Sequence, residues 1–209
     1  MMAKKGFYLM LEENIEMLRL GFDDEYDRQR YLDNKIIINK KMSRISAKAR
    51  QQAKRQTCYI CKKECSSFCN SHSVPKFCLK RVATEGKVYM SGIQAEFPIL
   101  GEDNGVNDAG TFHLICRECD GTLFQDYENP GAYAKIPTGK MLAQIVMKNY
   151  LLMISKRFEE RALYSIMAEQ FDVYDCAMHN IEIIDLDLAE YESEFKRAKI
   201  AGAGNHDDW

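Results

Sequence analysis

The sequence predicts an α+β protein in which a small cysteine-rich module is flanked by α-helices on both sides. Two Cys-x2-Cys pairs lie in a glycine-spaced segment with little helical periodicity. The apolar residues before and after this segment recur at intervals of three and four, as in amphipathic helices. We therefore divide the chain into three segments: 1–56, an N-terminal helical and basic arm; 57–130, a zinc-binding module; and 131–209, a C-terminal helical region.

The N-terminal segment is expected to be helical. Its apolar spacing predicts a helix over 7–20, and Gly21 is a natural stop. Residues 24–56 are charged with few apolar anchors, which predicts one long helix or two. From Asn34 to Thr57 there is no Asp or Glu, and Lys and Arg recur throughout. We interpret this basic block either as a phosphate-contacting arm or as a solvated helical face.

The overall composition does not identify a binding partner, but it bears on the cellular compartment. The net charge is −2, which does not by itself point to nucleic acid or membrane. The residues before the cysteines are not expected to be a signal peptide, and no apolar run reaches the ~18–20 residues of a membrane helix. We expect a cytoplasmic protein without a membrane partner. In a reducing compartment, paired cysteines are metal ligands more often than disulfides.

The remaining elements follow from local pattern. Strands are predicted at 87–90 and 111–115, and a helix from Asp120 to the residue before Pro130. Residues 139–170 give the strongest helical signal in the chain and predict one long helix, or two joined near Glu159. Their apolar stripe is either core or a face for homo-oligomerisation. A last helix is predicted over 188–198.

The two Cys-x2-Cys pairs, 54 residues apart, predict one structural zinc site. Each such turn aims two thiolates at one point, and two turns complete the tetrahedron that Zn²⁺ prefers. The predicted ligands are Cys58, Cys61, Cys116 and Cys119.

An alternative ligand set is Cys61, Cys65, Cys69 and His72. Otherwise Cys65, Cys69 and Cys78 are expected to be small buried or spare thiols. A thioredoxin-type redox pair is disfavoured because no βαβ pattern surrounds the first Cys-x2-Cys.

Between the two cysteine pairs lies Ser71-His72-Ser73-Val74-Pro75-Lys76, and Asp120 directly follows the second pair. In this order, residues 57–129 resemble the zinc-bearing branch of the HNH (ββα-metal) nuclease family. The resemblance implies that His72 is the general base and that Asp120 ligates a catalytic Mg²⁺ or Mn²⁺. Ser71 departs from the family pattern, because it stands where the family usually has an acidic or histidine ligand. The intervening Asn that orients the base would be Asn104 or Asn107.

The resemblance further implies a metal-dependent endonuclease that hydrolyses phosphodiester bonds of nucleic acid, with DNA as the expected partner. Such a nuclease would belong to a prokaryotic defence or mobile-element system. The neutral Ser71 favours an alternative, a zinc-stabilised nucleic-acid-binding or protein-interaction module that does not cleave. His72 could equally be structural, bonded to a backbone carbonyl. The residues expected to contact phosphates are Lys48, Arg50, Lys54, Arg55, Lys76, Lys80 and Arg81.

Overall fold

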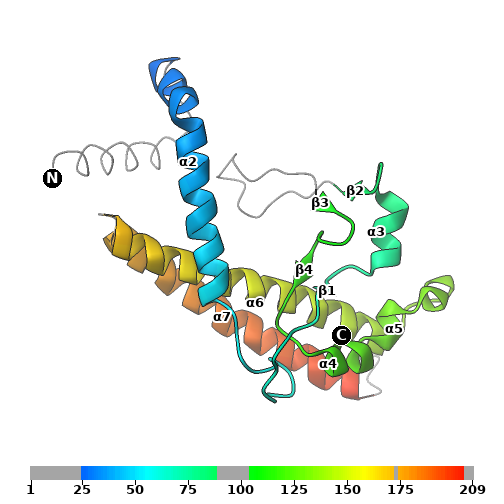
Figure 1. The fold of residues 1–209 in the computed structure, drawn as a ribbon. Coiled ribbons are helices and arrows are strands. Elements are labelled where there is room, and N and C mark those ends of the chain that lie inside the picture. The colour runs from blue at the N-terminus through cyan, green and yellow to red at the C-terminus, as the bar shows by residue number, and fades with distance from the viewer. Residues whose placement is uncertain (1–24, 89–103, 172–173, 205–209) are drawn as a thin grey trace. The chain divides into compact units, whose positions relative to one another are not determined.

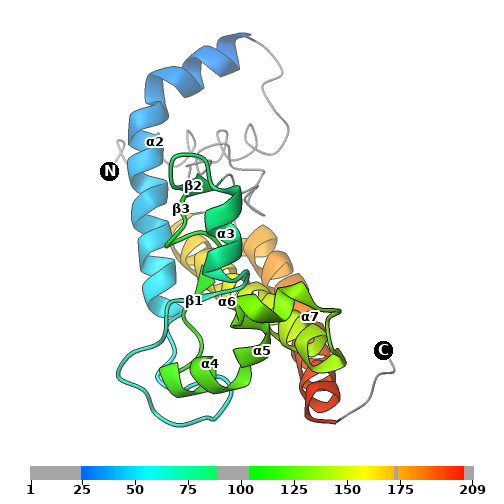
Figure 2. The same cartoon turned by 90° about the vertical axis from the view of Figure 1, so that its right-hand side faces the viewer.

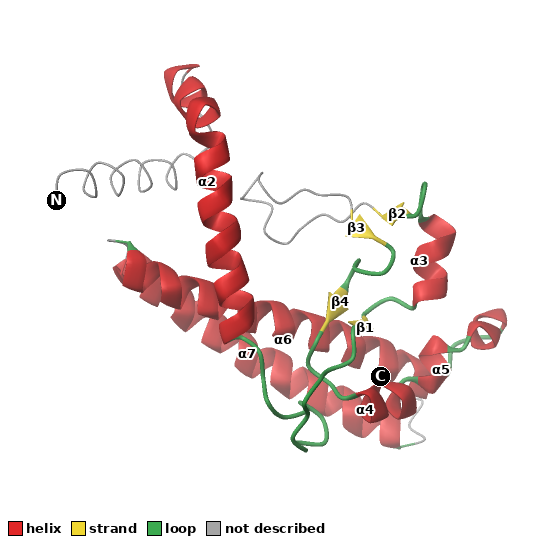
Figure 3. Cartoon of the chain, viewed as in Figure 1, coloured by secondary structure: helices red, strands yellow, loops and turns green. Residues whose placement is uncertain are grey.

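The computed structural model describes residues 25–88, 104–171 and 174–204. These residues are mostly helical, with two short antiparallel two-stranded sheets (Figures 1 and 3). The predicted α+β class is confirmed at this coarse level. The elements are α2 (Glu25–Gln52), β1 (Ser71–His72), α3 (Lys76–Val82), β2 (Lys87–Val88), β3 (Asn104–Gly105), β4 (Thr111–Phe112), α4 (Arg117–Leu123), α5 (Gln125–Glu128), the 3-10 helix η1 (Pro130–Ala134), α6 (Gly139–Gln170) and α7 (Tyr174–Ala203).

The chain separates into two compact units. Of the described residues, the first unit holds 25–53 and 159–183 apart from 172–173, and the second holds 54–88, 104–158 and 184–204. These units differ from the three segments expected from the sequence, which stay a prediction. The cysteine pairs and both sheets belong to the second unit.

The long helices match the periodicity of the sequence, with one exception. α2 is a single helix, and α6 runs without a break through residue 159. α7 begins at Tyr174, well before the predicted start at 188. Acidic residues hide the apolar period of its first half, but buried side chains recur there at intervals of four, three and four: Ala177, Ile181, Ile184 and Leu188. The helix predicted over 7–20 lies outside the described residues.

Within the second unit, α6 and α7 pack antiparallel. The Arg157 guanidinium lies 3.0 Å from the Asp187 carboxylate, and further along α6 and α7 Ala143 faces Gly202. A Cβ added to Gly202 would stand 2.9 Å from the Ala143 Cβ, so the two helices approach closely at this point. A larger residue at 202 would force them apart. None of the helices that the structure describes is both long enough and apolar enough to cross a bilayer.

A short antiparallel pairing of strands leads into α4. In β1 and β4, Ser71 lies opposite Phe112 and His72 opposite Thr111. β4 is shorter than the predicted strand 111–115, and β1 and α3 were not predicted, because two-residue strands and a seven-residue helix carry no readable period. Figure 1 shows β1 and β4 beside each other, and Figure 2 shows α3 following β1. In the chain, α3, β2 and β3 lie between β1 and β4, and α4 follows β4.

Candidate metal centre and buried ion cluster

The first cysteine pair lies in a tight loop closed by backbone hydrogen bonds. The Lys62 N–H donates to the Cys58 carbonyl at 2.9 Å, and the Cys58 N–H donates to the Lys63 carbonyl at 2.9 Å. Lys62 has a φ of +62°, the left-handed conformation that lets the chain reverse within so few residues. Within this loop the sulfur atoms of Cys58 and Cys61 lie within 4.8 Å of each other.

The second cysteine pair is built on the start of α4. Cys116 is the N-cap residue, and its sulfur accepts from the Cys119 N–H at 3.5 Å. Position 119 lies one helical turn further on, so both thiols face the same side. The predicted helix start at Asp120 was therefore slightly late, because a cysteine at the cap position does not resemble the usual Ser, Thr, Asp or Asn.

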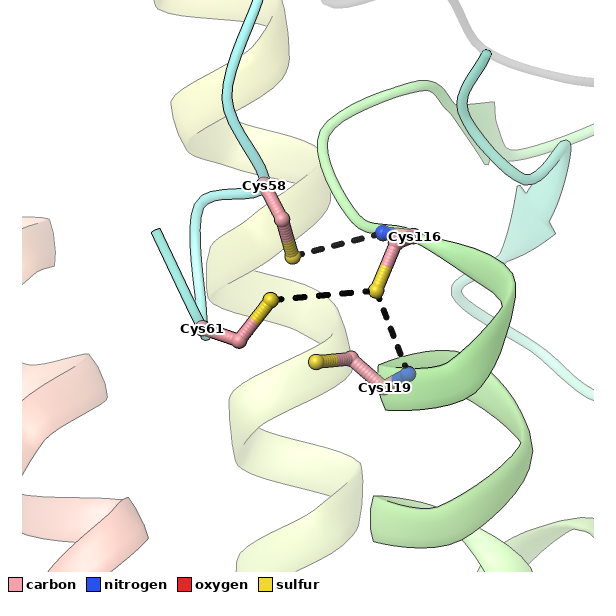
Figure 4. A group of neighbouring side chains, drawn as sticks. All are labelled: Cys58, Cys61, Cys116 and Cys119. Atoms are coloured by element: carbon pink, nitrogen blue, oxygen red, sulfur yellow. Dashed lines mark hydrogen bonds between the residues drawn. The ribbon is translucent and has the colours of Figure 1, made fainter. Parts of the chain in front are cut away.

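The four predicted zinc ligands converge on one point (Figure 4). Their sulfur atoms all lie within 4.8 Å of one another, and those of Cys61 and Cys116 are 3.9 Å apart. A tetrahedral Zn²⁺ with bonds of about 2.3 Å requires sulfur atoms about 3.8 Å apart. The Cys116 N–H also donates to the Cys58 sulfur at 3.3 Å, which stabilises a thiolate. The four cysteines could therefore hold a metal ion such as zinc.

The electrostatics of the four thiols also favour a cation. Burial raises the pKa of Cys58, but backbone N–H groups of Cys116, Cys61 and Ile60 outweigh it and lower that pKa to about 6. The pKa of Cys119 is raised instead, first by burial and then by hydrogen bonds to its three neighbours. One thiolate thus forms readily and opposes ionisation of the next. A divalent cation at the centre removes that repulsion.

The alternative ligand set is not assembled. Among the described residues, the four cysteines are the group of His, Cys, Asp or Glu side chains whose ligand atoms come together. The Cys65 thiol donates instead to the Lys63 carbonyl, and the Cys69 thiol to the Asp120 carboxylate at 3.2 Å. Burial followed by this hydrogen bond raises the pKa of Cys69 to about 11, so Cys69 stays a thiol near neutral pH.

Asp120 lies in a buried ion cluster next to the metal centre. Its Oδ1 accepts from the Lys148 ammonium at 2.6 Å and from the Ser71 hydroxyl, while its Oδ2 accepts from Cys69. The same ammonium contacts Glu128 Oε1 and Ser71 Oγ, each at 2.7 Å. Burial alone would raise the pKa of Asp120, but hydrogen bonds from Lys148 and Ser71 lower it below its usual value.

Lys148 is the residue of the candidate site that the sequence did not predict. Its side chain is fully buried, on the face of α6 that also carries buried Gln144 and Ser155. Three polar residues at helical spacing within the strongest apolar pattern of the chain could have indicated a buried polar site. A buried lysine in such a stripe requires carboxylate partners, and Asp120 and Glu128 supply them.

His72 is placed on β1 beside Ser71 but is not brought together with Asp120. Neighbouring strand residues project to opposite faces, and Ser71 is the one that contacts Asp120. The His72 Nε2 lies 3.1 Å from the Val106 carbonyl. Since a carbonyl only accepts, Nε2 carries the proton and Nδ1 is the basic nitrogen of the neutral ring. Val106 lies between Asn104 and Asn107, the two residues expected to orient His72, and the observed contact is with its backbone carbonyl.

The predicted phosphate contacts are spread over both units. Lys48 and Arg50 lie exposed on α2 in the first unit. The others belong to the second unit, where Lys54, Lys76, Lys80 and Arg81 are exposed. Arg55 is half-buried, and its guanidinium lies 5.3 Å from the centre of the Phe158 ring and 5.8 Å from that of Tyr59. It is therefore a packing residue as well as a cation.

Comparisons with known proteins found no relative: no protein-family model, no curated protein and no solved structure matches this chain.

Proposed function

We propose that the second unit is a zinc-stabilised module that binds nucleic acid without cleaving it. The observation that carries this proposal is the surface of α3. Lys76, Lys80 and Arg81 are all exposed there, the helix has no acidic residue, and none of the three cations forms an ion pair within the described stretches of the chain. Unpaired cations on one short helix suit contacts to backbone phosphates, which hold nucleic acid without reading its sequence.

The position of α3 supports the same proposal. The helix is the element after β1, and it lies in the chain between the first cysteine pair with β1 and β4 with the second cysteine pair and α4. This order is the one that the HNH resemblance implies. Zinc at the four thiols would make the layout rigid, because structural Zn²⁺ contributes folding free energy directly. A rigid layout keeps the cations of α3 in a constant arrangement before the ligand arrives.

A metal-dependent nuclease is the second candidate, and one observation favours it. The basic Nδ1 of His72 makes no hydrogen bond within the described residues, so it could accept a proton from water as a general base. The donor set at Asp120 does not fit a catalytic Mg²⁺ or Mn²⁺, however. Both of its carboxylate oxygens already accept from protein donors, one of which is a fixed positive charge. We therefore favour a module that binds nucleic acid over one that cleaves it.

Binding is tested by fluorescence anisotropy with labelled duplex and single-stranded DNA. The variant K76Q/K80Q removes two charges from α3, and the matched control K196Q/K199Q removes two from exposed positions on α7. For B-DNA, log K falls with log[salt] by about 0.9 for each phosphate neutralised. We expect K76Q/K80Q to weaken binding and to reduce this slope by up to about 1.8, while the control keeps both. Equal effects of the two variants would contradict the proposal.

Cleavage is tested on the same protein with supercoiled plasmid in Mg²⁺ or Mn²⁺. We expect a module that only binds DNA to leave the plasmid intact, even at protein concentrations that saturate the plasmid. Nicking that disappears in H72A, with DNA affinity unchanged, would establish the nuclease instead.

A further inference from the structure

The centre of the buried ion cluster is a fully buried ammonium group. Lys148 extends from α6 and places Nζ within 2.7 Å of oxygens from three other elements: Asp120 on α4, Glu128 on α5 and Ser71 on β1. The Lys148 side chain has no exposed surface, and Asp120 is only 15 % exposed. This arrangement is a cation site made of two carboxylates and a hydroxyl, with the cation supplied by the chain.

The ammonium uses its full bonding capacity. A protonated lysine has three N–H donors, and three oxygens accept from Lys148. On the apolar side, Nζ lies 4.4 Å from the centre of the Phe124 ring, close enough for a cation–π contact. Three oxygens and the Phe124 ring therefore stabilise the charge together. A divalent cation bound to Asp120 would have to share this carboxylate with a positive charge that cannot diffuse away.

A catalytic Ser–Lys pair explains the same contacts less well. The Ser71 hydroxyl is within 2.7 Å of Lys148 Nζ, as a nucleophile and its base would be. A general base must accept the hydroxyl proton, however, whereas Lys148 donates to the Ser71 oxygen and the Ser71 hydroxyl donates to Asp120. Ser71 is also only 1 % exposed, so an incoming substrate has no access to it.

We infer that the Lys148 ammonium is the resident cation of this centre and occupies the place at which the HNH resemblance expects a divalent metal. In this role Lys148 joins α6 to β1, α4 and α5, and it excludes Mg²⁺ and Mn²⁺ from Asp120. Neither role of Lys148 requires that the protein binds nucleic acid. Its consequence is testable: removing the ammonium while leaving space behind creates a divalent-cation site.

The test is a Mn²⁺ titration of the zinc-loaded protein, in which electron paramagnetic resonance measures unbound Mn²⁺. Mn²⁺ prefers oxygen ligands, so it does not compete for the four thiolates. The variant K148A removes the charge and opens space, whereas the matched control K148M removes the charge and fills the space. We expect K148A to bind one Mn²⁺ at least tenfold more tightly than the wild type. The added substitution D120N should abolish the gain, and K148M should show none.

Two results would overturn the inference. One is Mn²⁺ binding by the wild-type protein that is lost in D120N; the other is a folded K148A that binds Mn²⁺ no better than the wild type does. If K148A does not fold, NMR of the wild type decides. A buried ammonium held by three oxygens exchanges slowly with water, so its ¹⁵Nζ signal should be visible and unaffected by substoichiometric Mn²⁺. Broadening of that signal by Mn²⁺, reversed by excess Mg²⁺, would show that a metal reaches the site.

Discussion

Loss of the predicted zinc should unfold the part of the second unit that holds α3. Single cysteine substitutions can test this expectation. Cys119→Ser removes one of the four converging thiols, from a side chain that is 8 % exposed. Cys65→Ser is the matched control, because this thiol lies outside the group of four and donates to the Lys63 carbonyl. The two variants make the same chemical change at sites close to the same predicted metal.

The expected magnitudes differ widely. Structural zinc contributes about 10–16 kcal/mol of apparent folding free energy at neutral pH, and whole domains are stable by only about 5–15 kcal/mol. A change that releases the metal therefore removes most of the stability of the second unit. Replacing a weak thiol hydrogen bond costs at most about 1 kcal/mol. Cys119→Ser should consequently lose ordered structure, while Cys65→Ser should unfold like the wild type.

The assay combines metal analysis with circular dichroism. Wild type and Cys65→Ser should each contain one zinc per chain, and Cys119→Ser should contain much less. A strong chelator should reduce the helical signal of the wild type, and added Zn²⁺ should restore it. Wild-type protein without zinc would refute the reasoning. So would zinc that is lost in Cys65→Ser but kept in Cys119→Ser, because this pattern would point to a different ligand set.

Three further outcomes follow from the packing. Lys148→Met should lower the free energy of unfolding in urea by about 3–5 kcal/mol, because it leaves a buried carboxylate unpaired. Glu128→Gln should lower it by less than about 1 kcal/mol, since the Glu128 side chain is 38 % exposed. Equal losses would contradict the ion cluster. Gly202→Ala should destabilise by about 1–3 kcal/mol through overpacking against α6, and an unchanged unfolding midpoint would show that the helices can separate freely. The hydrogen bond from Lys140 lowers the pKa of Asp126. The stability that this ion pair contributes is therefore present above the pKa of Asp126 in the unfolded chain, and it is lost as the pH falls through the lower pKa of the folded protein. Carboxyl NMR should show that Lys140→Gln raises the Asp126 pKa, and no change would mean that the ion pair is not formed in solution.

The cysteine spacing by itself determined the candidate metal centre. A Cys-x2-Cys turn is a local geometry, and each pair needs only its own few residues to aim two thiols at one point. The helix over 139–170 was equally readable, because its period persists over many turns without glycine or proline. The early start of α7 was not, since acidic residues on its exposed face interrupt the apolar pattern.

The environment of Asp120 was decided only by the tertiary structure. Its position after the second cysteine pair suggested a metal ligand, and nothing local to that position indicates a lysine 28 residues further along the chain. Lys148 reaches Asp120 because α6 brings its polar stripe against β1, α4 and α5. The sequence alone thus determined which residues can bind a metal through local spacing. Long-range packing decided which cation each carboxylate meets, because a buried charge takes the partner that the fold places within hydrogen-bond distance.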